Sequence, residues 1–368
     1  MPEVTVYERR VNALREALEA GSLAGALLSR RQHVFYFTGV MPGASPAFLL
    51  AGPRQLVAVS PSPMERVETL IYTDYDIYHG WQVTEAAAAA LELALGRCDW
   101  AGRTVGLELA HLPTAYGNVA RRRIGAAADL EDLLWDLRSI KDTGEIAQIE
   151  ANLAANDRAF ETVQAVIRPG VTALQVWGAI YQTLANHAGG PVTLEADLGA
   201  GARGSCSAAK PGLEPLKAGD TVFVDIYSAL HGYYADSTRV FAVGEPAPRQ
   251  REIHDLLVQA QTAGEQLLKP GVPARAVDAA VRGVIERAGL GPHFDHDSGH
   301  GYGIFQREPP YLMPASALTL KEGMVIAVEP GIYIPGWGGM RLESTYVIEG
   351  RGARRLDHFP RELTVCAG

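Results

Sequence analysis

Two aspartates inside an apolar strand pattern constrain the fold of this chain more than any other feature. Residues 222–240, VFVDIYSALHGYYADSTRV, are typical of a β-hairpin, and Asp225 ends its first apolar run. A turn centred between Leu230 and His231 would place Asp225 and Asp236 directly opposite each other, with Cβ atoms about 5 Å apart on one face of the sheet. Because like charges repel at that distance, the pattern predicts either a positive group between the two carboxylates or a different register.

A second hairpin pattern repeats this placement of acids. Glu329 follows the apolar run Val325–Val328, and Glu343 lies in the segment GMRLESTYVI. Their midpoint is Gly336, inside the turn-rich IPGWGG, so a hairpin there would also set two carboxylates opposite each other. Any one of these acids could be an ordinary turn residue at a strand end, but the same placement in two hairpins favours a common site.

Histidines lie between the two hairpins, in the segment HFDHDSGHGYGIF. They are His293, His296 and His300, and glycines flank His300 on both sides, so that backbone can pass close to it. Imidazole next to buried carboxylates completes a set of side chains that can hold metal ions.

Four buried carboxylates need compensating charge. An isolated ionised carboxylate in a low-dielectric core costs several kcal/mol, and four would exceed the roughly 5–15 kcal/mol that stabilise a whole domain. Two divalent cations balance four carboxylates, and oxygen-rich ligation with imidazole suits manganese, cobalt, iron or zinc. Two ions about 3.5–4 Å apart bridge a water and polarise a carbonyl or phosphoryl oxygen. The pattern therefore predicts a dinuclear metal-dependent hydrolase.

Composition narrows the class of protein. The 368 residues are 47% hydrophobic and 20% charged, which is typical of a globular protein of two domains. The net charge of −9 and the lack of a Lys/Arg-rich run argue against nucleic acid as a partner. Three scattered cysteines indicate a reducing compartment, and neither a secretory leader nor a membrane segment is evident. We expect a cytoplasmic protein with no membrane partner.

Two domains are expected, with a boundary near residue 138. Residues 1–138 alternate helix and strand patterns, with strands predicted at AGALLS, HVFYFTG and RQLVAVS, and this half is predicted to be an α/β domain. A long amphipathic helix then begins at Asp142 or Thr143 and ends before Pro169. Residues 139–368 form the second domain, and the predicted fold class of the whole chain is α+β.

An internal echo runs through the second domain. The segment IRPGVTALQV at 167–176 is repeated about a hundred residues later as LKPGVPARAV at 268–277. Each copy is followed by an apolar strand that ends in an acid. The echo predicts either a duplicated half-domain, with two related hairpins facing each other, or two similar helix-turn-helix corners.

The segments VFVDIYSALHGYYADSTRVF, SGHGYG, VIAVEPGIYIP and GGMRLESTYVI closely resemble the pita-bread metallopeptidase family. That family contains prolidases (Xaa-Pro dipeptidases), Xaa-Pro aminopeptidases, methionine aminopeptidases and creatinase. LLSRRQHVFYFTGV resembles the amino-terminal domain of the prolidase, aminopeptidase P and creatinase branch. The resemblance covers nearly the whole chain. It implies a creatinase-like α/β domain before a duplicated pita-bread domain, and a homodimer in which the amino-terminal domain of one subunit shapes the neighbour's site.

The resemblance also implies a set of metal ligands, which are Asp225, Asp236, His300, Glu329 and Glu343. Asp236 and Glu343 would bridge two divalent ions, Asp225 would chelate one, and His300 and Glu329 would bind the other. Manganese is the expected metal, with cobalt, zinc and iron as alternatives. His296 matches a further family position and is predicted to be catalytic, and Glu329 is predicted to carry the proton to the leaving nitrogen of proline.

Two departures from the family bear on the substrate. Ala208 and Arg307 stand where the family usually has histidines that contact substrate and steady the tetrahedral intermediate. Arg307 is predicted to clamp a substrate carboxylate, and the alternative is an ion pair with Glu308 or another acid outside the pocket. Arg341 either binds substrate or neutralises the carboxylates. Tyr302, where the family commonly has isoleucine, is predicted to shape the pocket.

The sequence therefore predicts metal-assisted hydrolysis of an Xaa-Pro bond in a proline-containing di- or oligopeptide. A dipeptidase (prolidase) is the first choice, because an arginine near the cleft can bind a free carboxylate. The alternatives are an aminopeptidase P that acts on longer peptides, a non-peptidase hydrolase or lyase on the same fold, and an inactive binding module.

Overall fold

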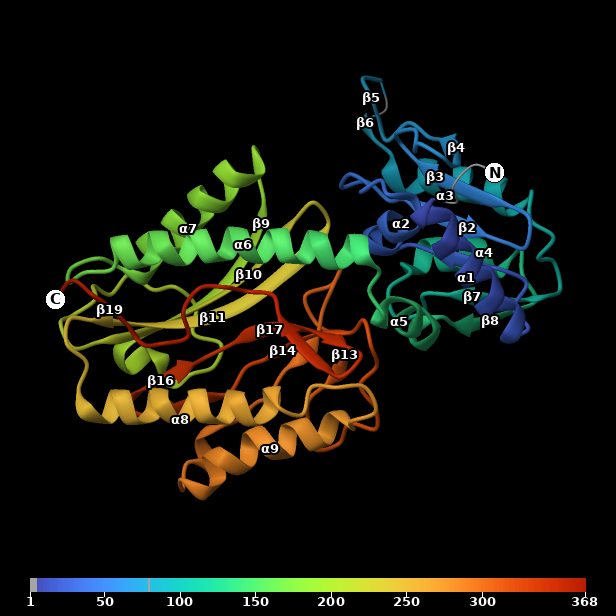
Figure 1. Ribbon diagram of the computed structural model, residues 1–368. Coiled ribbons are helices and arrows are strands. Elements are labelled where there is room, and N and C mark those ends of the chain that lie inside the picture. Colours follow the sequence, from blue (N-terminus) through green and yellow to red (C-terminus); the bar gives the residue numbers. More distant parts are fainter. Residues whose placement is uncertain (1–4, 79) are drawn as a thin grey trace. The chain divides into compact units, whose positions relative to one another are not determined.

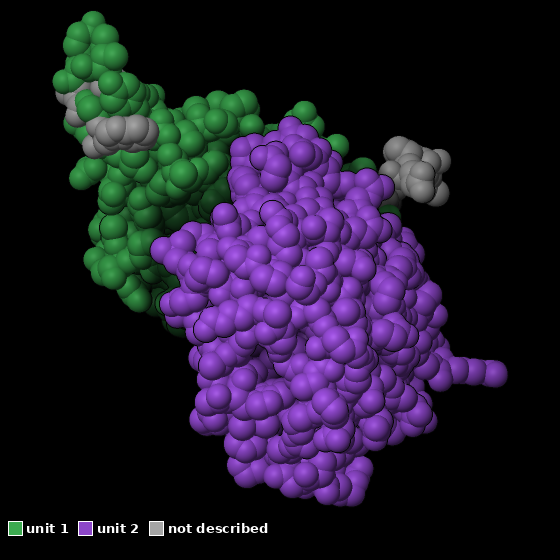
Figure 2. Space-filling view, turned by 90° about the vertical axis from the view of Figure 1, so that its left-hand side faces the viewer, with its two compact units in different colours: residues 1–138 green, residues 139–368 purple. Residues whose placement is uncertain are grey.

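The computed structural model describes residues 5–78 and 80–368. The chain divides into two compact units, Met1–Arg138 and Ser139–Gly368, which Figure 2 distinguishes by colour. Each unit has its own buried apolar core.

Unit 1 is built on a six-stranded sheet with the strand order β4-β3-β2-β1-β7-β8. Strand β1 is antiparallel to β2 and parallel to β7, so the sheet is mixed. The elements are α1 (Val6–Ala20), β1 (Ala26–Leu28), α2 (Arg31–Thr38), β2 (Phe48–Ala51), β3 (Leu56–Ser60), β4 (Glu68–Ile71), β5 (Tyr75–Asp76), β6 (Gly80–Trp81), α3 (Val83–Leu95), β7 (Thr104–Leu107), α4 (Thr114–Arg121), β8 (Ala126–Asp129) and α5 (Glu131–Ser139).

The segment HVFYFTG is a helix, α2, and the prediction of a strand there was wrong. A short apolar run does not distinguish a strand from a helix that is buried on most sides. In α2 the side chains of five of the eight residues are buried, so no polar face marks the helical period. Gly39 ends the helix with φ of 77°, a left-handed conformation that glycine adopts without strain.

Unit 2 begins with the long helix α6 (Thr143–Val166) at the predicted place. Asp142 caps it, and Glu145 completes a reciprocal capping box. Its buried face contains the expected apolar side chains and also two asparagines. Asn152 donates to the carbonyls of Leu230 and Tyr233, which fixes the end of a hairpin against the helix.

The rest of unit 2 contains two main sheets, with strand orders β19-β11-β10-β9 and β13-β12-β14-β17-β18, and a short β15-β16 pair. The elements are α7 (Ala173–Ala188), β9 (Thr193–Ala200), the 3₁₀ helix η1 (Gly201–Ser205), β10 (Thr221–Leu230), β11 (Tyr233–Val243), α8 (Pro248–Glu265), α9 (Ala274–Arg287), η2 (Gly291–His293), β12 (His300–Gly301), β13 (Glu308–Tyr311), β14 (Val325–Val328), β15 (Gly331–Ile334), β16 (Gly338–Arg341), β17 (Ser344–Glu349), β18 (Gly352–Arg355) and β19 (Thr364–Cys366) (Figure 1).

The helices of unit 2 lie outside the strands, in two groups. Side chains of α6 and α7 pack with β9, β10 and β11 in one apolar core, and side chains of α8 and α9 pack with β14 to β17 in the other. Val224 of β10 belongs to the first core and Phe223 to the second. Because side chains alternate along a strand, Asp225 shares the face of Phe223, away from α6 and α7.

Corresponding hydrogen bonds recur at the two echo segments. The amide of Gly170 donates to the carbonyl of Leu216 over 2.9 Å, and the amide of Gly271 donates to the carbonyl of Leu320 over 2.9 Å. Each corner joins two helices, α6 to α7 and α8 to α9, and each pair of helices precedes an acid-bearing antiparallel pair of strands. The interpretation as a duplicated half-domain is therefore confirmed.

Candidate metal centre

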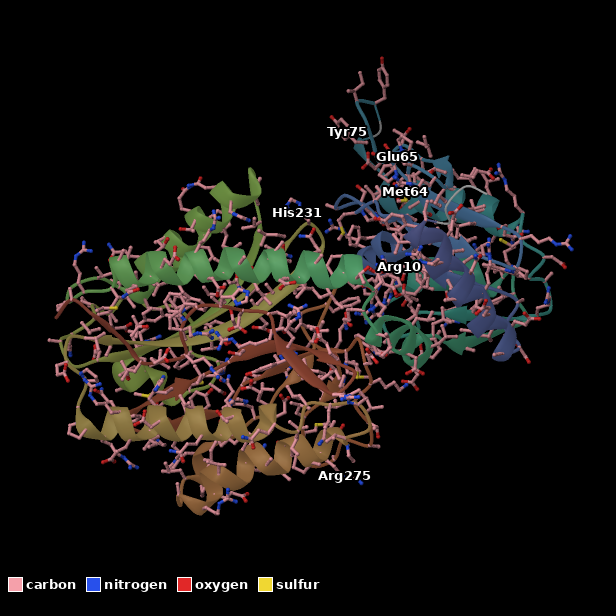
Figure 3. All side chains as sticks on the ribbon, viewed as in Figure 1. Arg10, Met64, Glu65, Tyr75, His231 and Arg275 are labelled. Carbon is pink, nitrogen blue, oxygen red and sulfur yellow. The ribbon has the colours of Figure 1, made fainter. Side chains whose placement is uncertain are left out.

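The first hairpin has its turn one residue later than predicted. His231 and Gly232 both have positive φ, 52° and 87°, as a two-residue type I′ turn requires (Figure 3 labels His231). In this register Asp225 faces Thr238, and Asp236 faces Tyr227. The two aspartates are therefore diagonal neighbours, and the prediction that they are directly opposite was wrong. They still share one face, because a partner shift of two residues preserves the side of the sheet.

The second hairpin has the predicted register. One register, centred on Gly336, relates β14 to β17 and β15 to β16. Glu329 and Glu343 lie opposite each other between these two pairs of strands. The backbone amides of these two acids donate to residues outside the second hairpin. The amide of Glu343 donates to Thr238 over 3.1 Å, and that of Glu329 donates to Ser298 over 2.9 Å. These bonds join the second hairpin to the first and to the residues before β12.

The five predicted ligands lie at one place between the two halves of unit 2. Ligand atoms of Asp236, His300 and Glu343 all lie within 4.8 Å of one another. Nε2 of His300 is 3.8 Å from Oδ2 of Asp236 and 3.4 Å from Oε1 of Glu329. The charge of Asp225 raises the pKa of both Asp236 and Glu343, as expected for one cluster. All five side chains are buried.

Burial controls the protonation of this cluster. Loss of solvation is the largest cause that raises the pKa of Asp225, Asp236 and Glu343, and it raises that of Glu329 to about 8. Burial lowers the pKa of His300 to about 3, so its imidazole is neutral. Its Nδ1 donates to the carbonyl of Gly301 over 2.8 Å, which leaves the lone pair of Nε2 facing the carboxylates.

Three buried carboxylate oxygens in the cluster accept no hydrogen bond. They are Oδ1 of Asp225, Oε1 of Glu329 and Oε1 of Glu343. A buried acceptor without a donor costs about 1–3 kcal/mol, and more when it is charged. Oxygen ligands with one imidazole are the donor set of hard and borderline divalent cations, so these residues fit a metal.

Arg341 places a positive charge beside one of the two hairpin aspartates, Asp225. It is buried, and its Nη1 donates to Oδ2 of Asp225. Its Nη2 donates to the carbonyl of Ser207 over 2.6 Å, and its Nε donates to the hydroxyl of Tyr333 over 2.8 Å. Because all three nitrogens are engaged, the contacts favour charge neutralisation over substrate binding.

Tyr333 connects Arg341 to His296, and sequence reasoning missed it. Its hydroxyl lies 3.0 Å from Nε2 of His296, and Nδ1 of His296 lies 2.7 Å from the carbonyl of Asp297. A carbonyl only accepts, so Nδ1 carries the proton and the tyrosine hydroxyl donates to Nε2. Burial lowers the pKa of His296 to about 3. The sequence did offer one signal for Tyr333. It lies four residues after Glu329 in the predicted hairpin, and side chains an even number of residues apart in a strand share one face.

Arg307 lies at the exposed edge of the cluster. It donates to Asp297, its Nη1 is 3.6 Å from Oε1 of Glu329, and its side chain is 39% exposed. It does not pair with Glu308, which is buried and lies 3.4 Å from Nζ of Lys141. Of the alternative partners, Arg307 therefore pairs with another acid, Asp297, and not with Glu308.

Tyr302 and Gln306 both support Asp236. Tyr302 is fully buried and donates to Thr345 over 2.9 Å, and Thr345 donates to the backbone carbonyl of Asp236 over 2.9 Å. A pocket-shaping role for Tyr302 is therefore not supported by its position. Nε2 of Gln306 donates to Oδ2 of Asp236 over 2.9 Å, a contact that no sequence pattern indicated. Ala208, at the other departure from the family, is exposed.

Comparisons with known proteins agree with this geometry. Residues 147–350 match the model of metallopeptidase family M24, and residues 10–140 match the creatinase/prolidase N-terminal domain. An Xaa-Pro dipeptidase of Pyrococcus horikoshii is 26% identical over 360 residues, covering 97% of this chain and 99% of the relative. A probable dipeptidase PepE of Mycobacterium bovis is 32% identical over 295 residues, covering 76% and 78%.

A solved structure is similar over almost the full length. The Xaa-Pro dipeptidase from Bacillus anthracis superposes with a TM-score of 0.86 at 25% identity and covers 98% of this chain and 99% of its own. The predicted two-domain fold, with a creatinase-like first domain and a pita-bread second domain, is confirmed. The family match spans both acid-bearing hairpins, and the chain belongs to metallopeptidase family M24.

Proposed function

We propose that this protein is a dinuclear metal-dependent dipeptidase that hydrolyses Xaa-Pro bonds, a prolidase. The observation that carries the proposal is the cluster of Asp225, Asp236, His300, Glu329 and Glu343, three of which keep a buried oxygen without a donor. Relatives with the name Xaa-Pro dipeptidase support the choice of substrate.

We assign the two metal positions by residue. Asp236 and Glu343 would hold both ions, Asp225 one of them, and His300 and Glu329 the other, with manganese expected and cobalt, zinc or iron as alternatives. Such ions supply a water of low pKa and polarise the carbonyl that is to be attacked. The hydrogen bond from Nδ1 of His300 to Gly301 keeps its Nε2 available as a ligand.

Other side chains would position the substrate and move its proton. Glu329 has one buried oxygen that accepts no hydrogen bond, and we propose that this residue carries the proton to the leaving nitrogen of proline. His296 is held by Tyr333 and Asp297, which suits it for positioning more than for proton transfer. Arg307 is partly exposed beside Glu329, where its planar group can bind the free carboxylate of a dipeptide.

A homodimer is the proposed assembly. The hairpin of β5 and β6 in unit 1, on which Figure 3 labels Tyr75, exposes apolar side chains. Ile77 is 76% exposed and Tyr78 is 85% exposed. Exposed apolar groups of this kind gather at protein interfaces, and we propose that a second copy of this chain covers them.

We propose that the enzyme acts in the cytoplasm. Its three cysteines are free thiols, which suits a reducing compartment. Within the described residues, no helix has the length and hydrophobicity needed to cross a membrane.

The test is turnover of Leu-Pro against Leu-Pro-Ala with added manganese, for the wild type and for Arg307→Ala and Arg307→Lys. A charge-assisted hydrogen bond contributes about 1.5–3 kcal/mol, so Arg307→Ala should raise KM for Leu-Pro by about tenfold or more, with kcat less affected. Arg307→Lys, which keeps the charge but loses the planar fork, should be intermediate.

Other results would point elsewhere. A preference for the tripeptide, with little effect of Arg307→Ala, would indicate an aminopeptidase P. Metal binding without hydrolysis of either peptide would indicate different chemistry on this fold and would overturn the proposal.

A further inference from the structure

A second partly exposed cation, Lys210, lies in the segment between η1 and β10. Its Nζ is 2.8 Å from Oδ1 of Asp197 and donates to the hydroxyl of Tyr227 over 2.8 Å. The lysine side chain is 63% exposed, whereas that of Asp197 is only 10% exposed. A buried acid therefore anchors an ammonium group that remains open to solvent.

The two partners of Lys210 are neighbours of the candidate ligands. Asp197 of β9 lies directly opposite Asp225 of β10, and Tyr227 of β10 lies directly opposite Asp236 of β11. Directly opposite residues have Cβ atoms about 4.5–5.5 Å apart on the same face of a sheet. Lys210 is thus fixed at the border of the candidate metal centre, on the side of β9 and β10.

Backbone contacts hold the segment that carries Lys210. The carbonyl of Ser207 accepts from Nη2 of Arg341 over 2.6 Å, and the carbonyl of Ala209 accepts from the amide of Leu198 over 2.8 Å. The first contact joins the segment to Arg341, which pairs with Asp225, and the second joins it to β9. The position of the ammonium therefore follows from the same residues that build the site.

The ammonium group has donor capacity to spare. It carries three N–H donors, of which Tyr227 accepts one, and the carboxylate of Asp197 lies in ion-pair contact beside it. Burial lowers the pKa of Lys210, but its hydrogen bonds to Asp197 and Tyr227 outweigh this and raise the pKa, so the group stays charged. Within the part of the chain that the structure describes, no third acceptor is seen for it.

Arg307 and Lys210 lie at the border of the cluster, in segments that precede different strands. Arg307 precedes β13 and contacts Asp297 and Glu329, whereas Lys210 precedes β10 and contacts the partner of Asp225. Arg341, which pairs with Asp225, is buried, and each of its three nitrogens donates a hydrogen bond within the protein. A substrate bound at the centre therefore meets two accessible positive groups.

We infer that Lys210 binds an acidic side chain in the residue before proline, so that the preferred substrates are Glu-Pro and Asp-Pro dipeptides. This rests on the proposed dipeptidase function, in which Arg307 takes the terminal carboxylate. The carboxylate of the preceding residue then accepts the third N–H of Lys210. The inference concerns specificity, because the metal ligands themselves act alike on every Xaa-Pro bond.

The experiment compares Glu-Pro with Gln-Pro, which have nearly the same shape and differ in charge. An accessible charge pair contributes up to about 1 kcal/mol, so the manganese-loaded wild type should favour Glu-Pro about fivefold in kcat/KM. Lys210→Met should reduce this ratio to about one, and Lys210→Arg should preserve most of it. Lys269→Met, at the exposed corner between α8 and α9, is the matched control and should leave the ratio unchanged.

Two further measurements keep the inference testable if Lys210→Met does not fold. Raising the ionic strength should weaken the preference of the wild type for Glu-Pro, because salt screens an exposed pair. Glu195 is exposed and lies opposite Tyr227, so Glu195→Gln should increase the preference by removing a repelling charge.

The outcomes separate the inference from the proposed function. If the wild type hydrolyses Glu-Pro and Gln-Pro equally well, or if Lys210→Met keeps the preference, the inference is overturned and the dipeptidase function stands. If Glu-Pro, Gln-Pro and Leu-Pro are all inert, the proposed function fails. Calorimetric binding of Glu-Pro and Gln-Pro to the manganese-loaded protein then tests the charge preference by itself, and equal affinities overturn it.

Discussion

Glu329 lies among other acids and two guanidinium groups, and burial raises its pKa from 4.5 to about 8. The neighbouring charges of Asp297 and Asp225 act in the same direction, whereas Arg341 and Arg307 oppose it. Without metal, the folded protein therefore keeps a proton here that the unfolded chain releases near pH 4.5. At the residue scale, the site exchanges protons for metal ions.

This exchange predicts how the stability of the metal-free protein depends on pH. Its free energy of unfolding should decrease as the pH rises from about 4.5 to about 8, because the folded state alone holds the Glu329 proton in that interval. Urea unfolding in the presence of a chelator, at several pH values, measures this slope. Glu329→Gln should flatten it, whereas Glu322→Gln, at an exposed position, should not. An equal slope in Glu329→Gln would contradict the assignment.

At the scale of elements, a buried ion pair joins the two hairpins. Nη2 of Arg239 in β11 donates to Asp357, and its Nη1 donates to the backbone carbonyl of Glu343. Asp357 also accepts from the amide of Thr345 in β17 over 2.8 Å. The pair joins β11 to β17 where the candidate ligands meet, so it supports the backbone of the site.

Breaking this pair should be costly. Removing one partner of a buried ion pair leaves an unpaired charge, so Asp357→Leu should lower the free energy of unfolding by about 3–5 kcal/mol. Arg239→Met with Asp357→Leu should recover part of that loss, because neither charge is then left alone. Denaturant unfolding of the wild type, both single variants and the double variant forms the cycle. A cost below about 1 kcal/mol for Asp357→Leu would show that the pair is not structurally important.

At the scale of the whole molecule, all the candidate ligands belong to unit 2. The described side chains that build the two apolar cores of unit 2 come from residues 155–366. An ion that binds only the folded protein stabilises it by about 2.7 kcal/mol when its concentration is a hundred times Kd. That stabilisation should be confined to the unit that binds the ion.

Metal removal should therefore act on one unit. Chelation should increase amide hydrogen exchange in β10, β11, β14 and β17, and should leave exchange in the six-stranded sheet of unit 1 unchanged. Hydrogen exchange followed by mass spectrometry, with and without manganese, measures both units in one experiment. Uniform loss of protection across both units would indicate that they unfold as a single cooperative body.

Sequence reasoning succeeded where the signal is local. The apolar run that ends at Asp225 predicted a hairpin strand with one acid-bearing face, and the cap at Asp142 predicted the start of α6. It failed at α2, because burial on most sides removes the helical period. It also placed the first turn one residue too early, because a two-residue turn depends on the φ angles of His231 and Gly232, which composition does not specify.

The sequence by itself determined which acids share a strand face and the family, because side-chain period and characteristic motifs are properties of the chain. It left the duplicated half-domain as one of two interpretations. Only the tertiary structure decided what each cation binds. Arg341 pairs with Asp225, Arg307 with Asp297, and Lys210 with Asp197. Such pairs form when folding brings loops and strands together, and the free energy of burying a charge then selects its partner.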